Sequence, residues 1–406
     1  MSERARLYLI LLNSTLIVTA FMGSRVTVPL FAIKLGASTA TVGVLMSLFA
    51  ILPMLLSLQT GRWIDRVGTA LPMIGSAAAI ALLLVAGYLI PALWMLYVLS
   101  AGVGLAVAVF SIASVSVAGA IGPAKERTAI FSWLALAGAA GTFVGSIVAG
   151  YLIDSYGHAA ALAALALAPA LAAALVAGRR YSRTPRERPA REPGKSKVFD
   201  LLRLPTVRAA LLVGSLMGAS WDVYAFLIPV YGTSIGLSAA SIGNIMGATG
   251  LAMFLVRLGL PPLMRLFDEW QLVIASMFCC ALVFVLFPFA STNVILIGLS
   301  LLFGAAFGAV QPIVNALLFN ASPAGRIAEV SGLRSTVQNG LHTAMPALFG
   351  VLGAALGVLP MFWSMGALLG VGGWLSKTRW SRYGADREPR QDQAQNQKRA
   401  PGRAGE

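Results

Sequence analysis

Residues 29–46 read PLFAIKLGASTATVGVLM, and residues 229–246 read PVYGTSIGLSAASIGNIM. The two stretches share a proline, two glycines, a serine and a methionine when one is shifted by 200 residues. The same shift aligns four further pairs, which are Gly104 with Gly304, Pro123 with Pro323, Gly150 with Gly350, and Gly157 with Gly357. Helix contacts and helix breaks constrain glycine and proline more than other residues. One offset that holds from Pro29 to Gly157 therefore predicts two duplicated halves.

The composition places both halves in a lipid bilayer. Of the 406 residues, 58% are hydrophobic and 11% are charged. Soluble domains carry about 25% charged residues, so this chain lacks the polar surface that would cover a water-facing fold. A helix crosses the bilayer with about 20 apolar residues. This ruler predicts spans at 7–31, 39–59, 70–90, 92–121, 129–153, 158–178, 207–231, 238–258, 271–290, 293–319, 328–352 and 357–376.

We therefore predict an all-α membrane protein of about 12 transmembrane helices, built as two pseudo-symmetric six-helix bundles. The bundles are expected over residues 1–178 and 207–376, with a basic cytoplasmic linker at 179–206 and a disordered cytoplasmic tail at 377–406. The apolar start resembles a signal peptide, but no small-residue cleavage site follows it, so we expect it to be retained as the first span. Parallel repeats of this kind put a substrate site between the halves.

The net charge of +15 is concentrated in particular loops. Of the 30 Lys and Arg residues, nine lie between Arg179 and Arg203 and eight between Lys377 and Arg403. The loops on the opposite side hold Lys34 and no other Lys or Arg. This is the positive-inside pattern, and it predicts a multi-pass protein of a bacterial-type inner membrane with both termini in the cytoplasm. A nucleic-acid partner is not expected, because no recognition motif accompanies the charges.

The residues that carry chemistry in soluble enzymes are scarce. The adjacent Cys279 and Cys280 lie in an apolar run and are interpreted as core packing, since neighbours in one helix do not bridge each other. No His/Asp/Glu cluster or nucleotide-binding loop is found, so we expect no enzymatic activity, no cofactor and no metal. The partners expected are a small-molecule substrate, a proton and the lipid bilayer, with the chain acting as a monomer.

Two ionisable residues stand out inside predicted spans, where charges are costly and usually functional. Arg25 is in the first span and Asp222 is in the seventh, within GASWDVYAF. The repeat aligns Asp222 with Met22, which puts the two charges within about 5 Å in depth. We hypothesise that Arg25 and Asp222 pair across the central cavity and that Asp222 carries a proton. The alternatives are that Arg25 extends to the outer interface and that Asp222 belongs to a static pair.

Other polar and aromatic residues in the spans are candidates for substrate contact. In the eleventh span, Arg334, Gln338 and His342 recur every four residues and therefore share one helix face. The remaining candidates for the cavity are Gln311, Asn315, Trp221 and Tyr224. Amides and aromatics also hold neighbouring helices together, so each of them has a packing alternative. His342 has a second alternative as a neutral packing residue.

The loop after the second span reads GRWIDRVG at residues 61–68. It resembles the cytoplasmic signature of the major facilitator superfamily, with Gly61, Asp65, Arg66 and Gly68 in the matching places. The resemblance implies two six-helix bundles that alternate around a central cavity, and it implies that Asp65 latches the cytoplasmic gate against the eleventh span, with Arg334 as its partner. The alternative for Asp65 is a cap on the third helix.

Two departures from the family's pattern affect the predicted transport mode. Ser100 stands where the family often carries an arginine in the fourth span, so that residue's proton-linked role does not transfer. In GTFVGSIVAG of the fifth span, Ser146 and Ala149 replace the proline and one glycine typical of the family's drug/proton antiporters.

The resemblance and the buried acid together predict a secondary active transporter that works by alternating access. Proton-coupled export of a small organic compound or metabolite is the first expectation. The alternative is uptake of a small organic anion by proton symport, with Arg25 as its counter-charge. A non-transporting membrane receptor is a third alternative, and it gives no reason for charges inside the membrane.

Overall fold

The computed structural model describes residues 3–121, 127–178, 200, 204–322 and 327–384. The predicted linker, apart from a few residues, and the tail beyond Gly384 lie outside the described residues. The first half consists of α1 (Glu3–Lys34), α2 (Thr39–Val67), α3 (Ala70–Leu89), α4 (Leu93–Ala118), α5 (Arg127–Tyr156), α6 (His158–Leu165) and α7 (Leu167–Ala177). The second half consists of α8 (Pro205–Ser234), α9 (Ala239–Leu266), α10 (Glu269–Leu286), η3 (Phe287–Phe289), α11 (Asn293–Ala321), α12 (Ile327–Leu356) and α13 (Leu359–Gly384).

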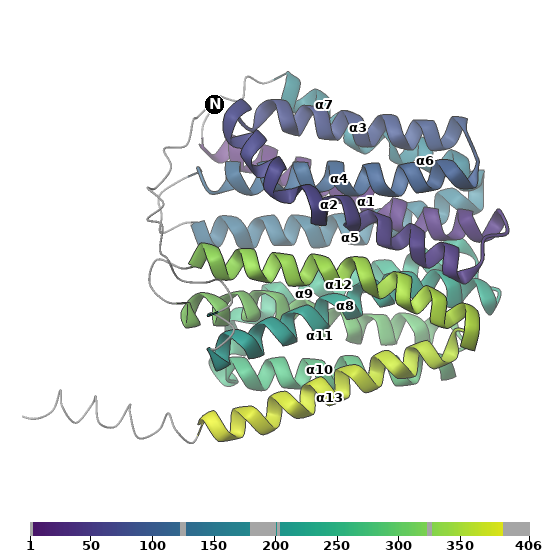
Figure 1. The fold of residues 1–406 in the computed structure, drawn as a ribbon. Helices are drawn as coiled ribbons and strands as arrows, with labels where there is room; N and C mark the ends of the chain where they lie inside the picture. Colours follow the sequence, from purple (N-terminus) through teal and green to yellow (C-terminus); the bar gives the residue numbers. More distant parts are fainter. Residues whose placement is uncertain (1–2, 122–126, 179–199, 201–203, 323–326, 385–406) are drawn as a thin grey trace, which may run out of the picture.

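The fold prediction is confirmed, since the described residues are helical with no strand and form two stacked bundles (Figure 1). The predicted sixth span is divided into α6 and α7, because Pro169 has no N–H to donate to Leu165. The helix α13 continues past the predicted end at residue 376 and reaches Gly384. Within the described residues, ten helical segments are long and apolar enough to cross a bilayer. The helices α12 and α13 complete the second half.

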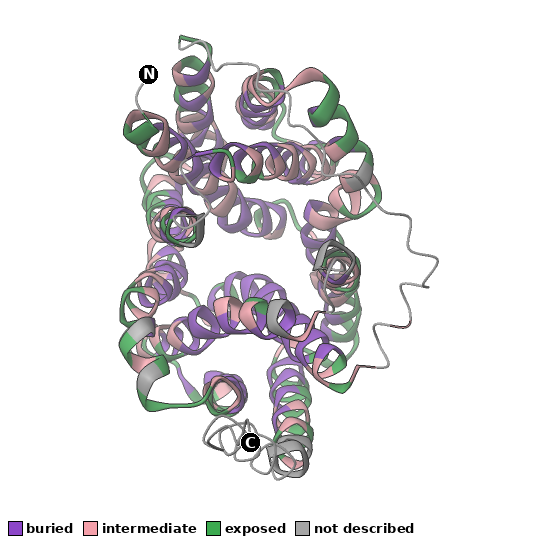
Figure 2. Ribbon diagram, turned by 90° about the vertical axis from the view of Figure 1, so that its left-hand side faces the viewer, coloured by how far each residue is buried: buried purple, intermediate pink, exposed green. Residues whose placement is uncertain are grey.

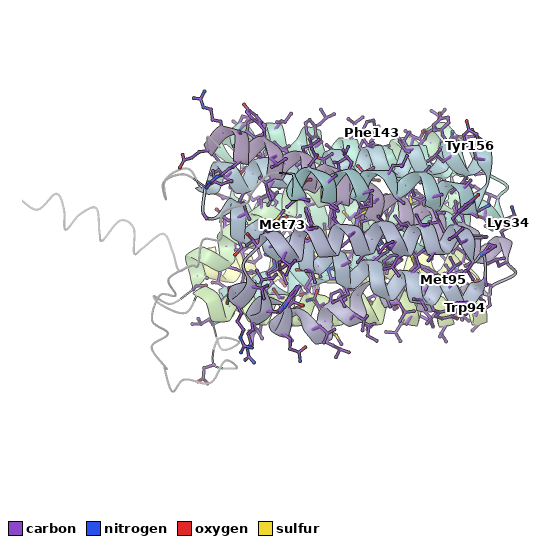
Figure 3. All side chains as sticks on the ribbon, turned by 90° about the horizontal axis from the view of Figure 1, so that it is seen from above. Lys34, Met73, Trp94, Met95, Phe143 and Tyr156 are labelled. Atoms are coloured by element: carbon purple, nitrogen blue, oxygen red, sulfur yellow. The ribbon has the colours of Figure 1, made fainter. Side chains whose placement is uncertain are left out.

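The helices run along one common direction, so the assembly has two ends. One end carries Glu3 and Gly384, the described ends of the first and last helices, and we call it the termini end (Figure 1). Lys34, Trp94 and Tyr156 lie at the opposite end, the Lys34 end, while Met73 lies towards the termini end (Figure 3). Trp94 and Tyr156 are exposed, as expected for aromatic residues at a membrane interface.

The outer surface is apolar, and the most buried helices lie between the halves. Large exposed hydrophobic side chains such as Leu82, Leu282 and Val294 occur in both halves, which suits a surface in contact with lipid. The helices α1 and α8 are the most buried spans, and they pack against each other at the seam between the bundles. Figure 2 shows this arrangement end-on, with buried residues on the inner helices. Polar groups on α1 and α8 are therefore shielded from lipid.

The duplicated glycines occupy equivalent places in both halves. Gly36 and Gly236 have φ values of 81° and 77°, and Gly157 and Gly357 have 88° and 83°, which only glycine adopts without strain. Each of them follows the end of a helix at the Lys34 end. The glycines aligned by the sequence repeat thus occupy turns of the same conformation in both halves.

Candidate functional site

The ion pair predicted between Arg25 and Asp222 is present at the seam. Arg25 Nη2 donates to Asp222 Oδ1 over 3.0 Å, and the two side chains are only 7% and 4% exposed. Arg25 comes from α1 of the first bundle and Asp222 from α8 of the second. A charge-assisted hydrogen bond of this length in a lipid-shielded seam joins the two halves directly.

The second carboxylate oxygen of Asp222 is also used. His342 Nδ1, from α12, is hydrogen-bonded to Asp222 Oδ2. His342 is therefore a direct partner of the buried acid, in contrast to the packing alternative. One signal for this contact can be read from the sequence, namely the spacing of four residues that puts His342 on the same helix face as Gln338. Three helices from two bundles meet at one carboxylate.

A glycine on α8 makes room for the polar face of α12. A Cβ atom at Gly218 would lie 3.1 Å from Gln338 Nε2 and 3.5 Å from His342 Cε1. Gly218 is one helical turn before Asp222, so both residues lie on the face of α8 that meets α12. Gln338 thus sits against α8 one turn closer to the termini end than His342.

The Arg25 guanidinium has a second neighbour and one unused donor. Its Cζ atom lies 5.8 Å from the centre of the Phe21 ring, in the range of a cation–π contact. Its Nε atom is buried and has no hydrogen-bond partner among the described residues. Since Asp222 is the carboxylate bonded to Arg25, a proton taken up by Asp222 would remove the charge that holds Arg25 in place.

A second polar contact lies between α11 and α12, closer to the termini end. Arg334 Nη2 donates to Gln311 Oε1 over 2.6 Å. Asn315, one turn further along α11, is exposed. The latch expected between Arg334 and Asp65 stays a prediction. Gly68 of the signature loop closes α2 with a φ of 81°, which explains the need for glycine at that position.

Trp221 and Tyr224 pack inside the second bundle. The Tyr224 ring is fully buried and stacks on Phe303 with ring centres 4.5 Å apart. Its hydroxyl is 2.7 Å from Thr249 Oγ1 and 3.0 Å from Ser300 Oγ. The Trp221 ring stacks on Phe307 at 5.3 Å. These contacts favour the packing alternative for both aromatic residues.

Two inter-bundle contacts close the Lys34 end, and sequence reasoning did not identify them as contacts. A Cβ atom at Gly43 of α2 would lie 2.7 Å from Gly350 Cα of α12, and one at Gly243 of α9 would lie 3.0 Å from Gly150 Cα of α5. The shift of 200 residues converts one pair into the other, so the signal was present in the aligned glycines. The helices α2 and α12, and likewise α5 and α9, are therefore in backbone-to-backbone contact near the Lys34 end.

An acidic residue strengthens one of these two contacts. Asp154, at the end of α5, accepts hydrogen bonds from the backbone N–H groups of Ala239 and Ala240 over 3.0 and 2.8 Å. It thereby caps the first turn of α9, where a negative charge is favoured by the helix dipole. The equivalent position in the other half is Ala354. The two seams are therefore held with different strength.

The described residues contain no group of three or more His, Cys, Asp or Glu side chains that could hold a metal ion. The polar groups between the bundles are instead the Asp222 carboxylate, the Arg25 guanidinium, the His342 imidazole and the Gln338 amide. Such groups bind polar solutes and exchange protons.

Comparison with known proteins agrees with the fold. The family model described as Major Facilitator Superfamily matches residues 10–346. A human protein, Solute carrier family 67 member A1, is 28% identical over 354 residues, which cover 82% of each chain.

Solved structures show the same architecture at low sequence identity. A crystal structure of a variant of the nucleoside transporter NupG has a TM-score of 0.72 at 12% identity and covers 92% of this chain and 99% of its own. A POT family transporter in complex with a thioalcohol-conjugated peptide has a TM-score of 0.75 at 13% identity, covering 93% and 96%. A bacterial homologue of the human lysosomal transporter Spinster, in an inward-facing and unoccupied conformation, has a TM-score of 0.73 at 15% identity, covering 94% and 99%.

Proposed function

Because the chain belongs to the major facilitator superfamily and is a transporter of that type, we propose that it couples export of a small organic solute to proton movement. The single observation that carries this proposal is the buried Asp222, whose two oxygens bond Arg25 of one bundle and His342 of the other. Ionisable groups shielded from lipid at such a seam commonly form proton relays in transporters.

The coupling we propose is a direct consequence of that geometry. In the state closed at the Lys34 end, ionised Asp222 holds Arg25 and so ties α1 to α8. Protonation of Asp222, with His342 as the neighbouring proton carrier, removes the negative charge and weakens this tie. The bundles then separate more easily at the Lys34 end, so that the proton and the solute move through one site in alternation.

Uptake of a small organic anion by proton symport is the alternative. It is favoured by the Nε atom of Arg25, which is buried and has no partner among the described residues. An anionic group that met this donor would compete with Asp222 for the guanidinium. The direction of transport distinguishes the two readings, because cells lacking the protein would accumulate an exported compound and lose an imported one.

The solute is sought first in whole cells. An untargeted metabolite profile and a drug-susceptibility profile of overexpressing and deletion strains, repeated with Asp222→Asn, would identify compounds that depend on the buried acid. Transport of such a compound is then measured in proteoliposomes with and without an imposed proton gradient.

The variant Asp222→Asn keeps the size of the side chain and removes its charge. We expect it to lose gradient-driven accumulation while it retains exchange of labelled for unlabelled solute, which needs no net proton movement. The matched control is Asp268→Asn, since Asp268 caps α10 outside the seam and asparagine also caps helices. Gradient-driven accumulation by Asp222→Asn at the wild-type rate would refute the proton coupling.

A further inference from the structure

Arg334 is a partly buried cation that lies deep enough in the bundle to need compensation for its charge. It is seven residues after the start of α12 at Ile327, which corresponds to about 10 Å from the end of the helix. Its Nε atom is buried and has no hydrogen-bond partner among the described residues. A guanidinium that simply extended to the headgroups would keep its nitrogens in water.

The partner of Arg334 is neutral. Gln311 Oε1 accepts a hydrogen bond from Arg334 Nη2 over 2.6 Å, but an amide carbonyl does not balance a full positive charge. Arg25 differs, because its charge is matched by Asp222. Arg257, a third arginine at the seam, donates to the carbonyl oxygen of Ala135 over 2.6 Å and has no unpartnered buried nitrogen. Of these three arginines, Arg334 is thus the one that combines, within the described residues, a neutral partner, no ion pair with a carboxylate and an unpartnered buried donor.

The surroundings of Arg334 continue towards the buried acid. Gln338 follows one turn later on the same face of α12, and His342 follows after another turn, about 12 Å from Arg334 along the helix. Both side chains pack against Gly218 of α8, where a Cβ atom would lie 3.1 Å from Gln338 Nε2 and 3.5 Å from His342 Cε1. Hydrogen-bonding groups therefore extend from Arg334 to the carboxylate of Asp222.

We propose that Arg334 and Gln311 form the site that binds an oxyanion group, a carboxylate or a phosphate, of the transported solute. The guanidinium offers paired N–H donors that match the two oxygens of such a group. When the anion arrives, it takes the place of Gln311 Oε1, and the amide NH₂ of Gln311 becomes a further donor to it. The rest of the solute extends along Gln338 towards His342. This inference rests on the proposed function, because it names the substrate class of the proposed transporter.

Binding is tested on the purified full chain without knowledge of the natural solute. The thermal unfolding temperature is measured with three anionic probes and their uncharged counterparts, which are salicylate and salicylamide, succinate and succinamide, and phenyl phosphate and phenol. We expect at least one anion, and not its counterpart, to stabilise the wild type. The apparent affinity for that anion is expected to fall about tenfold or more in Arg334→Gln, as loss of charge-assisted hydrogen bonds implies.

A second variant separates loss of the site from loss of the fold. Gln311→Glu supplies Arg334 with an internal carboxylate at the position of the present acceptor, so the protein should be at least as stable as the wild type and yet insensitive to the anion. The matched control Arg257→Gln removes a different seam arginine and should keep the wild-type response. Wild-type protein that responds to none of the anions, or equal binding in the wild type and both site variants, would overturn the inference.

Anionic lipid is a second source of the same chemical group, and lipid composition distinguishes it. The measurements are repeated in nanodiscs of phosphatidylcholine alone and with added phosphatidylglycerol. A rise in stability that depends on phosphatidylglycerol and Arg334, without a response to soluble anions, would assign the site to a lipid headgroup and overturn the proposal for a solute.

The test of the anion site can fail or succeed independently of the test of proton coupling at Asp222. If the solute found in cells is uncharged and Arg334→Gln transports it at the wild-type rate, the anion site is refuted and the coupling at Asp222 is untouched. If an anion binds through Arg334 but Asp222→Asn still accumulates solute with the gradient, the site stands and the coupling fails.

Discussion

The change Gly243→Ala tests whether backbone contact between the bundles keeps the Lys34 end shut. A Cβ atom at this position of α9 would lie 2.6 Å from Ser146 O and 3.0 Å from Gly150 Cα, both on α5. Ordinary contacts begin at 3.4 Å, so the helices must separate by 3.4 − 2.6 Å, or about 0.8 Å, at this point. Overpacking of this kind costs about 1–3 kcal/mol in the closed state. The closed state should therefore lose about 5- to 150-fold in population relative to the open one.

The assay is a distance distribution between spin labels in lipid nanodiscs. Labels at Tyr156 of α5 and Ser234 of α8 report on the Lys34 end, where both residues are exposed. We expect Gly243→Ala to shift the distribution towards longer distances. The control is Gly259→Ala on the same helix, where a Cβ atom would meet nothing within 4 Å. Both variants gain about 1 kcal/mol of helix propensity, so only the contact differs. Identical distributions for the two variants would refute the reasoning.

Three further predictions concern other contacts. Asp154→Ala removes the cap on the first turn of α9 and should weaken closure by about 1 kcal/mol, seen as a longer distance between the same labels, while an unchanged distance would rule out a role in closure. Tyr224→Phe loses a buried hydroxyl network and should lower unfolding stability by about 1 kcal/mol without changing transport, and a transport defect in a stable variant would return Tyr224 to the site. Gly218→Val pushes against Gln338, because even a Cβ atom at this position would lie 3.1 Å from Gln338 Nε2, and it should reduce transport strongly at unchanged expression. Wild-type transport would show that the position of Gln338 beside α8 does not matter for transport.

The ion pair between the bundles could be predicted from the sequence because the two halves are repeats, so aligning them shows which residues lie at the same depth. The 200-residue shift placed Arg25 and Asp222 at similar depth, and the structure contains their ion pair. Periodicity put His342 on one face with Gln338, but it did not specify which helix that face meets. The depth of a residue in the membrane and the helix face on which it lies follow from its own helix. Its contacts also depend on how the neighbouring helix is rotated about its axis.

Other parts of the site depend on that rotation and could not be predicted. The hydrogen bond from Arg334 to Gln311 on α11 was not predicted, because it depends on how α11 and α12 are rotated toward each other. Tyr224 lies two residues from Asp222, and this small step along α8 turns its ring into the second bundle. The role of Asp154 could not be predicted, because its partners are backbone N–H groups and no side-chain pattern reveals them. Close neighbours in sequence thus have separate roles.

The ion pair at the seam also has a consequence for biogenesis. Arg25 and Asp222 are 197 residues apart, so the first bundle enters the membrane before the carboxylate has been synthesised. Until α8 arrives, the nascent chain holds a cation in the bilayer without its counter-ion, which is a costly arrangement. We therefore expect the first half to depend on the second for the counter-charge of Arg25. Ribosome-bound intermediates that end before α8 should remain open to quality-control proteases, and co-expression of the two halves as separate chains should rescue them.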